Sequence, residues 1–157
     1  MTPMTGTFAT DSVFASRERE LLETLAELMI PAGDELPSAA EATIFAAVLG
    51  ALSQRPDVVR AGLESLVGLA AGSAHSPFPA LDTAEQLALV EALRARAPGF
   101  VALFESAVAA CYYQDDRVLR SLGLPARAPF PEGNAVAPTD WSLLDPVRTR
   151  QPFYKRI

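Results

Sequence analysis

Thirteen of the 157 residues are proline, and their positions limit where the chain can form long helices. Proline has no backbone N–H, so it is tolerated in the first turn of a helix but interrupts a helix interior. Seven prolines lie within the first 98 residues, at or outside the ends of apolar stretches, and the other six fall within the last 34 residues. This distribution predicts helices in the first part of the chain and a largely irregular last part.

Six segments have apolar residues spaced three or four apart, which is typical of a helix with one buried face. The predicted helices are 17–30, 38–52, 56–69, 82–96, 100–112 and 115–122. The side chains expected to face inward include Leu21, Leu22, Leu25, Leu28, Met29, Ile44, Phe45, Val48, Leu49, Leu52, Val58, Val59, Leu63, Leu66, Val67, Leu87, Val90, Leu93, Phe100, Leu103, Phe104, Val108, Tyr112, Val118, Leu119 and Leu122.

Helix ends are marked by residues that cap them. The side chain of a serine, threonine or aspartate just before a helix accepts a hydrogen bond from a free backbone N–H of the first turn. A glutamate three residues later can accept the N–H of that capping residue, and the pair is called a capping box. Glycine suits the left-handed position just past a helix end. The predicted caps are Ser16, Ser38 with Glu41, Asp82 with Glu85, Asp115 and Gly123.

No alternating strand pattern stands out, so the sequence predicts an all-α fold. We expect a compact bundle of about five to six helices, followed by a long proline-rich, largely irregular C-terminal tail. The expected organisation is a flexible lead-in over 1–15, a helical domain over 16–123 and an extended tail over 124–157 that packs on a partner subunit.

The charge is unevenly distributed. Residues 1–122 carry 8 basic against 16 acidic residues, a net of −8, and residues 123–157 carry 5 against 3, a net of +2. An overall charge of −6 argues against binding to nucleic acid or to an anionic membrane surface. No apolar run of about 18 residues and no secretory signal are visible. We therefore expect a cytoplasmic protein, or a periplasmic one if a partner carries the export signal.

The tail contains many apolar residues for an irregular segment. It holds the chain's one tryptophan, Trp141, together with Phe130, Leu143, Phe153 and Tyr154. Disordered segments are usually poor in such residues. Either the tail packs over its own helices or it lies along another protein, and aromatic and arginine residues are those that anchor interfaces.

Few residues offer catalytic chemistry. His75 is the one histidine and Cys111 the one cysteine, which are too few for a histidine and cysteine metal site. Cys111 is expected to be a packed thiol, and His75 a loop residue without a catalytic role. Asp115, Asp116 and Arg117 form the remaining polar cluster. They could serve as a helix cap with a local ion pair, or as a polar anchor for a partner.

Neighbouring residues on a helix point in different directions. Of the adjacent tyrosines Tyr112 and Tyr113, one is therefore expected to lie in the core. The other is expected to be exposed or covered by a partner.

The segment YYQDDRVLRSLGLPARAPFPEG, residues 112–133, resembles the signature of the gluconate 2-dehydrogenase subunit 3 family. The stretches LLETLAELMIPAGDELPSAAEA and LLDPVRTRQPFYKR are similar to that family's early helix and terminal stretch. The signature positions carried over are Tyr112, Tyr113, Asp116, Arg117, Gly123, Pro125, Arg127, Pro129, Pro131 and Gly133.

This resemblance implies a non-catalytic small subunit. In the family, a large subunit of the glucose–methanol–choline (GMC) type holds FAD and oxidises a sugar or similar alcohol, and some complexes add a cytochrome subunit. The small subunit assists folding, stability or export of the large one. Many relatives begin with a twin-arginine export signal, which this sequence does not show.

We therefore expect a chain that binds a flavoprotein large subunit and itself holds no cofactor, metal or catalytic residue. The predicted partner-binding residues are Tyr112, Tyr113, Asp116, Arg117, Arg127, Phe130, Pro131, Trp141, Arg148, Phe153 and Tyr154. One alternative is a free-standing helical interaction or small-ligand-binding protein. The other is an enzyme that depends on His75 or Asp116.

Overall fold

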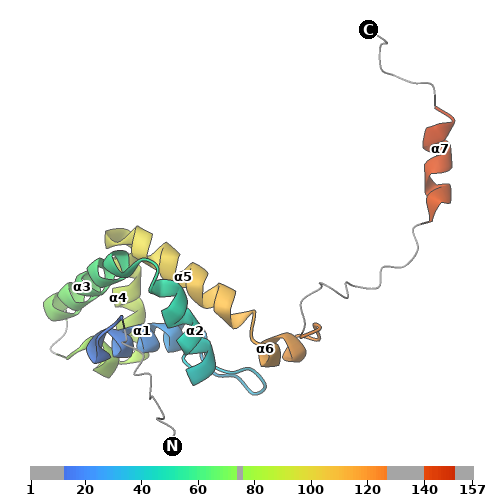
Figure 1. The fold of residues 1–157 in the computed structure, drawn as a ribbon. Coiled ribbons are helices and arrows are strands. Elements are labelled where there is room, and N and C mark those ends of the chain that lie inside the picture. Colours follow the sequence, from blue (N-terminus) through green and yellow to red (C-terminus); the bar gives the residue numbers. More distant parts are fainter. Residues whose placement is uncertain (1–12, 74–75, 127–139, 151–157) are drawn as a thin grey trace, which may run out of the picture. The chain divides into compact units, whose positions relative to one another are not determined.

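The computed structural model describes residues 13–73, 76–126 and 140–150, and every regular element in these ranges is helical. The chain divides into two units, Met1–Ala126 and Arg127–Ile157. The first contains α1 (Ser16–Met29), α2 (Ala42–Leu52), α3 (Pro56–Ser73), the 3₁₀ turn η1 (Phe78–Ala80), α4 (Thr83–Arg96), α5 (Pro98–Tyr112) and α6 (Asp116–Ser121). The prediction of an all-α fold is confirmed, and Figure 1 shows the helices in chain order.

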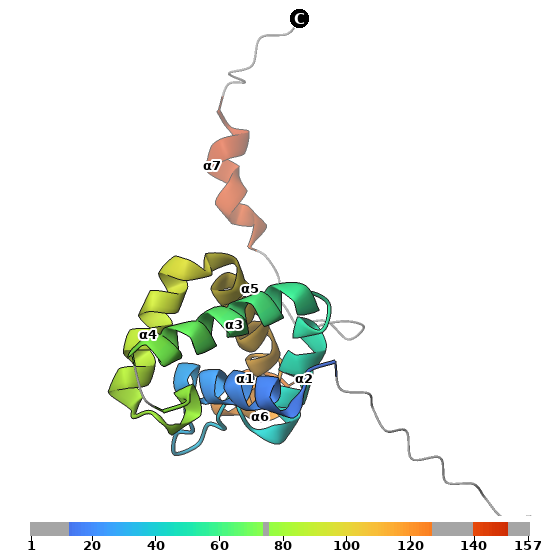
Figure 2. The same cartoon turned by 90° about the vertical axis from the view of Figure 1, so that its left-hand side faces the viewer.

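Helix α5 is the centre of the first unit because it packs against α2, α3 and α4. Helix α1 packs against α3 and η1, and Figure 2 shows it alongside α3. The core contains the expected apolar faces of these helices. Its fully buried large side chains are Phe78, Leu22, Ile44, Leu52, Leu66, Leu93, Val48, Val59, Val108 and Val118.

A close approach between two helices lies at Gly62 of α3. A Cβ atom at this position would lie 2.6 Å from Cβ of Phe100 and closer still to the ring. Only a residue without a side chain leaves room for Phe100, which lies in the first turn of α5. Glycine at 62 therefore sets the separation of α3 and α5.

Several predicted boundaries are confirmed. Helix α1 ends just before Pro31 and α3 begins with Pro56. Asp82 and Glu85 form the predicted capping box, each bonding the other's backbone N–H.

The end of α6 also follows the sequence. Gly123 has a φ of 71°, and the N–H groups of Gly123 and Leu124 donate to the carbonyls of Arg120 and Leu119. This is the hydrogen-bond pattern of a Schellman motif, in which glycine takes the left-handed position.

The predicted cap of α1 is wrong. Ser16 is already the first residue of the helix, and Ala15 is its N-cap. The backbone N–H of Ala15 donates to the Glu18 carboxylate at 2.7 Å. A glutamate in the first turn therefore closes the start of α1 without any contribution from the Ser16 hydroxyl.

The predicted cap of α2 is also wrong. The Ser38 hydroxyl donates to the Glu27 carboxylate and accepts the N–H of Ala40, so it belongs to the loop. The N-cap of α2 is Glu41, whose carboxylate accepts the N–H of Thr43 at 3.2 Å. Helix α2 therefore begins later than a cap at Ser38 predicts.

Three side chains expected in the core are exposed: Met29, Leu87 and Leu122. In α1, Ala26 takes an inward position, and Met29 is the last residue of the helix. In α4, the buried positions are Gln86, Leu89 and Leu93, so Leu87 lies beside the buried face. Leu122 is the C-cap of α6, beyond the buried Val118. Periodicity thus found each helix but not every edge of its buried face.

The second unit contains two short helices within its described residues, η2 (Trp141–Leu144) and α7 (Asp145–Arg148). The tail is therefore not irregular throughout. Asp140 caps η2 by accepting the N–H of Ser142 at 3.0 Å, and Pro146 lies in the first turn of α7. Neither helix buries any of its residues.

Candidate functional site

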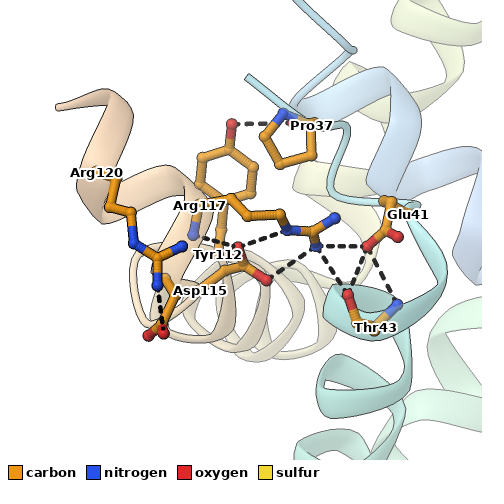
Figure 3. Close-up of polar contacts among 8 residues, drawn as sticks. Pro37, Glu41, Thr43, Tyr112, Asp115, Arg117 and Arg120 are labelled. Carbon is orange, nitrogen blue, oxygen red and sulfur yellow. Dashed lines mark hydrogen bonds and ion pairs between the residues drawn. The ribbon is translucent and has the colours of Figure 1, made fainter. Parts of the chain in front are cut away.

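A group of polar side chains joins the start of α6 to the start of α2. We call it the α2–α6 clamp, and it consists of Glu41, Thr43, Asp115 and Arg117. Figure 3 shows the guanidinium of Arg117 between the side chains of the two helix starts. Asp115 is also the N-cap of α6, since its carboxylate accepts the N–H of Arg117 at 2.9 Å. The same local geometry that begins α6 therefore places Arg117.

Arg117 makes its side-chain contacts with both helix starts at once. Its Nε and Nη2 donate to the two carboxylate oxygens of Asp115 at 3.0 and 2.9 Å. Nη2 also donates to Glu41 Oε2 at 2.7 Å and to Thr43 Oγ1 at 2.8 Å. Planar guanidinium groups favour such paired contacts with carboxylates. One arginine thus ties together helix starts that are more than 70 residues apart in the chain.

Two further hydrogen bonds attach the end of α5 and α6 to the loop before α2. The Tyr112 hydroxyl donates to the Pro37 carbonyl at 3.0 Å, a contact drawn in Figure 3. The Ser121 hydroxyl donates to the Glu35 carbonyl at 3.0 Å. Together with the clamp, these bonds hold the loop between α1 and α2 against the last helix of the first unit.

The clamp changes the acidity of its members. Hydrogen bonds from Arg117 and Thr43 lower the pKa of Glu41 from 4.5 to about 2. The hydrogen bond from Arg117 also lowers the pKa of Asp115, and the two carboxylates raise the pKa of Arg117. All three groups are therefore charged at neutral pH. This state suits a standing ion pair, whereas a general acid or base needs a pKa near the working pH.

Cys111 lies in the last turn of α5 and is a packed thiol, as expected. It is partly buried, and this burial raises the pKa of its thiol. Among the residues that the structure describes, no three His, Cys, Asp or Glu side chains are grouped closely enough to hold a metal ion. His75 lies outside the described residues. The hydrogen bonds of Arg117 join the starts of α2 and α6. We therefore assign the α2–α6 clamp the structural role of orienting these two helices.

The structure separates the predicted site residues of the first unit. Tyr112 is 3% exposed and lies in the core, while Tyr113 is 56% exposed and meets the Tyr112 ring edge to face. The prediction of one buried and one exposed tyrosine is confirmed. Asp116 is exposed and pairs with Arg120 at 3.0 Å, so Asp115 and not Asp116 is the carboxylate bound to Arg117.

The remaining predicted partner-binding residues belong to the second unit. Trp141 and Arg148 are both exposed there, and Arg148 pairs with Asp145 at 3.4 Å. The others lie outside the described residues: Arg127, Phe130, Pro131, Phe153 and Tyr154. Whether any of these residues contacts a partner stays a prediction.

Sequence reasoning missed Glu41 and Thr43 as members of the clamp. Glu41 was assigned to a capping box, and no local pattern pairs it with an arginine 76 residues later. The signal available in the sequence was its position at a helix start, where carboxylates are favoured by the free N–H groups. That signal predicts a negative charge at this place but does not name its partner.

The first unit also has a surface hollow between α1 and α2. It has a volume of about 670 Å³. The apolar residues of its lining include Val13, Phe14, Phe45 and Leu49. This hollow is one place where the binding of a small ligand, as in the alternative function, can be tested. It does not include any residue of the clamp.

Glu41 provides a prediction about pH. Because its pKa is lower in the folded chain, its contribution to stability is complete above about pH 4.5 and is lost as the pH falls to about 2. We expect the free energy of unfolding of the unaltered chain to fall more steeply over this range than that of Glu41→Gln. Urea unfolding followed by circular dichroism between pH 2 and 6 measures both slopes.

The matched control is Glu64→Gln, which removes the same charge from an exposed position of α3. Its slope should follow that of the unaltered chain more closely than Glu41→Gln does. Parallel curves for the unaltered chain and Glu41→Gln would show that the clamp does not hold the Glu41 charge.

None of the helices in the described residues is long and apolar enough to span a membrane. No curated protein and no solved structure matches the chain. The profile of the family described as gluconate 2-dehydrogenase subunit 3 does match it, over residues 16–124. The matched range begins with α1, includes the whole α2–α6 clamp and ends just after Gly123. Since it covers more than half of the chain, the protein belongs to the gluconate 2-dehydrogenase subunit 3 family.

Proposed function

We propose that this chain is a non-catalytic small subunit that binds and stabilises an FAD-dependent large subunit of the GMC type, a dehydrogenase of sugars or other alcohols. The observation that carries the proposal is the family match, which spans the helical body from α1 to the end of α6. The family description names a subunit, and a subunit implies a second polypeptide. In this proposal, FAD and the catalytic residues belong to that second polypeptide.

The geometry of the α2–α6 clamp supports a structural role for the signature residues. Arg117 already binds Asp115, Glu41 and Thr43. Tyr112 binds the backbone of the α1–α2 loop inside the unit. These groups are used to shape the protein surface around α6. Tyr113 is the exposed aromatic residue beside them, and it is the one we propose for contact with the large subunit.

The net negative charge of the helical body indicates what kind of partner surface it would bind. Residues 1–122 carry a net charge of −8, which favours association with a basic surface. Such complementarity mainly speeds the encounter of two proteins and depends on salt. We therefore propose that a basic face of the large subunit receives the helical body.

The test is co-expression with a candidate large subunit, a GMC-type flavoprotein dehydrogenase sought next to this chain's gene. We expect more soluble, flavin-loaded dehydrogenase when the chain is present, and co-purification of the two polypeptides. The yield is measured by flavin absorbance, and turnover by reduction of a dye with candidate sugars and alcohols. A yield and a turnover that are the same with and without this chain would overturn the proposal.

A folding-deficient chain provides the control. Leu66→Asp places a carboxylate at a fully buried position of α3, where an unpaired charge is costly. Its expression should leave the dehydrogenase as poorly soluble as when the chain is absent. This control separates an effect of the folded subunit from an effect of expressing a second gene.

A further inference from the structure

The helical segment Trp141–Arg148 exposes most of its apolar surface. Trp141 is 64% exposed, and Leu143, Leu144 and Val147 are exposed as well. No residue of η2 or α7 is buried. Four large apolar side chains within seven residues of sequence therefore remain in contact with solvent in this unit.

Three of the apolar side chains are arranged along one side. Trp141, Leu144 and Val147 recur every three residues, a spacing that stacks side chains on one face of a 3₁₀ turn and keeps them close on an α-helix. The polar side chains are bound locally. The Ser142 hydroxyl donates to Asp140 at 2.6 Å, and the Thr149 hydroxyl donates to the Pro146 carbonyl at 3.1 Å. The polar groups thus have partners within the segment, whereas the apolar face is left to solvent there.

A helical segment of this length is only marginally stable by itself. Isolated helices shorter than about 12–15 residues are marginal in water. Here the Asp140 cap and Pro146 in the first turn favour the helical form before any partner binds. Such preorganisation lowers the conformational entropy lost on binding. The segment is therefore suited to binding as a short helix in a groove of another protein.

The charges of the segment indicate what lies at one end of that groove. Arg148 and Arg150 follow the apolar face, and residues 123–157 carry a net charge of +2. Arg148 pairs with Asp145 at 3.4 Å, but both side chains are well exposed to solvent. An exposed pair of this kind contributes little, so a carboxylate of another protein can replace Asp145 at small cost. A partner that fits has an apolar groove with acidic residues at one end.

We propose that Trp141, Leu144 and Val147 dock as one face into an apolar groove of the dehydrogenase large subunit, with Arg148 next to a carboxylate at the end of that groove. This rests on the proposed function and adds the element that the large subunit recognises. Tryptophan and arginine are among the residues that most often dominate binding at protein interfaces. Trp141 is accordingly the main anchor.

The chain's one tryptophan allows a direct test. The full-length chain is labelled with 5-fluorotryptophan, so that its ¹⁹F spectrum reports on position 141 alone, and is mixed with the fraction of unlabelled dehydrogenase that stays soluble when it is expressed alone. We expect the ¹⁹F signal to move on complex formation and to lose its sensitivity to exchange of H₂O for D₂O. A complex that forms while the signal keeps its position and solvent sensitivity would overturn the inference and leave the proposed function intact.

Variants test the face itself. Trp141→Ala is expected to weaken binding on the order of 30-fold, as for a strong interface anchor. Thr149→Ala, on the polar side, is the matched control and should change the affinity by less than about threefold. Because Trp141 is exposed, Trp141→Ala should leave the circular dichroism of the free chain unchanged.

The outcomes separate the two proposals. Equal binding by Trp141→Ala, Thr149→Ala and the unaltered chain would overturn the docking face alone. Failure of the two polypeptides to co-purify after co-expression would overturn the proposed function, and the docking face with it. Dissociation constants from titration calorimetry distinguish these results.

Discussion

Phe78→Ala is expected to lower the free energy of unfolding by about 3–5 kcal/mol, the usual cost of removing a buried aromatic ring. Phe78 is only 1% exposed, and η1, which carries it, packs against α1 and α3. Its carbonyl accepts a hydrogen bond from the buried Gln86 side chain at 3.1 Å, which holds this turn in place. The cavity left by removal of the Phe78 ring should therefore not be filled easily by movement of its neighbours. A loss of this size is a large part of the roughly 5–15 kcal/mol that stabilises a typical domain.

Urea unfolding followed by circular dichroism measures the effect. Leu87→Ala is the matched control, because Leu87 was expected in the core but is 49% exposed. It should change the free energy of unfolding by no more than about 0.5 kcal/mol. Equal losses for the two variants would show that η1 is not part of the core.

Gly62→Ala is expected to lower the free energy of unfolding by about 1–3 kcal/mol, the usual cost of overpacking a core. The added methyl group would lie 2.6 Å from Cβ of Phe100 and closer still to its ring. The Phe100 Cβ is bonded to the α5 backbone, so turning the ring does not remove the contact. Helices α3 and α5 must move apart, and the Phe104 ring beside Phe100 would move with them.

The same substitution elsewhere on α3 provides the control. Gly68 has nothing within 4 Å of an added Cβ, and alanine is the better helix former. Gly68→Ala should therefore raise the free energy of unfolding by about 0.4–1 kcal/mol. If both Gly62→Ala and Gly68→Ala raise the free energy of unfolding, α3 and α5 do not approach each other closely at Gly62.

Features that depend on neighbouring residues could be predicted from the sequence. The helical periodicity located α1 to α6 within a few residues. The capping box of Asp82 and Glu85 and the left-handed Gly123 form as expected. These features are set by backbone geometry and by hydrogen bonds that span three to five residues. The sequence therefore contains, close together, all the groups that make them.

Predictions failed where another residue took the role that the local pattern offered. Ser38 has the local pattern of a helix cap, but its hydroxyl binds Glu27 instead, so α2 begins later. Met29 and Leu87 fit the apolar spacing of their helices, but other residues of α1 and α4 are buried in their place. Local patterns name what a side chain is able to do, and packing selects one of those options.

The candidate site likewise contains residues whose roles could be predicted from the sequence and residues whose roles could not. The sequence predicted Asp115 as a cap with a local ion pair, and the structure has both. The partners Glu41 and Thr43 could not be predicted, because the contacts with Arg117 join residues 76 and 74 positions apart. Likewise the two tyrosines were expected to differ, but only the packing of α5 decides that Tyr112 is the buried one.

The sequence by itself determined the all-α class, the approximate helices, the acidic body and the resemblance to the family. These follow from composition and from short-range spacing, which tertiary contacts do not alter. The tertiary structure decided which helices meet, that Gly62 admits the Phe100 ring, and that Arg117 joins α6 to α2. Such contacts form between residues far apart in the chain, so only the packing of the helices brings their groups within hydrogen-bonding or van der Waals distance.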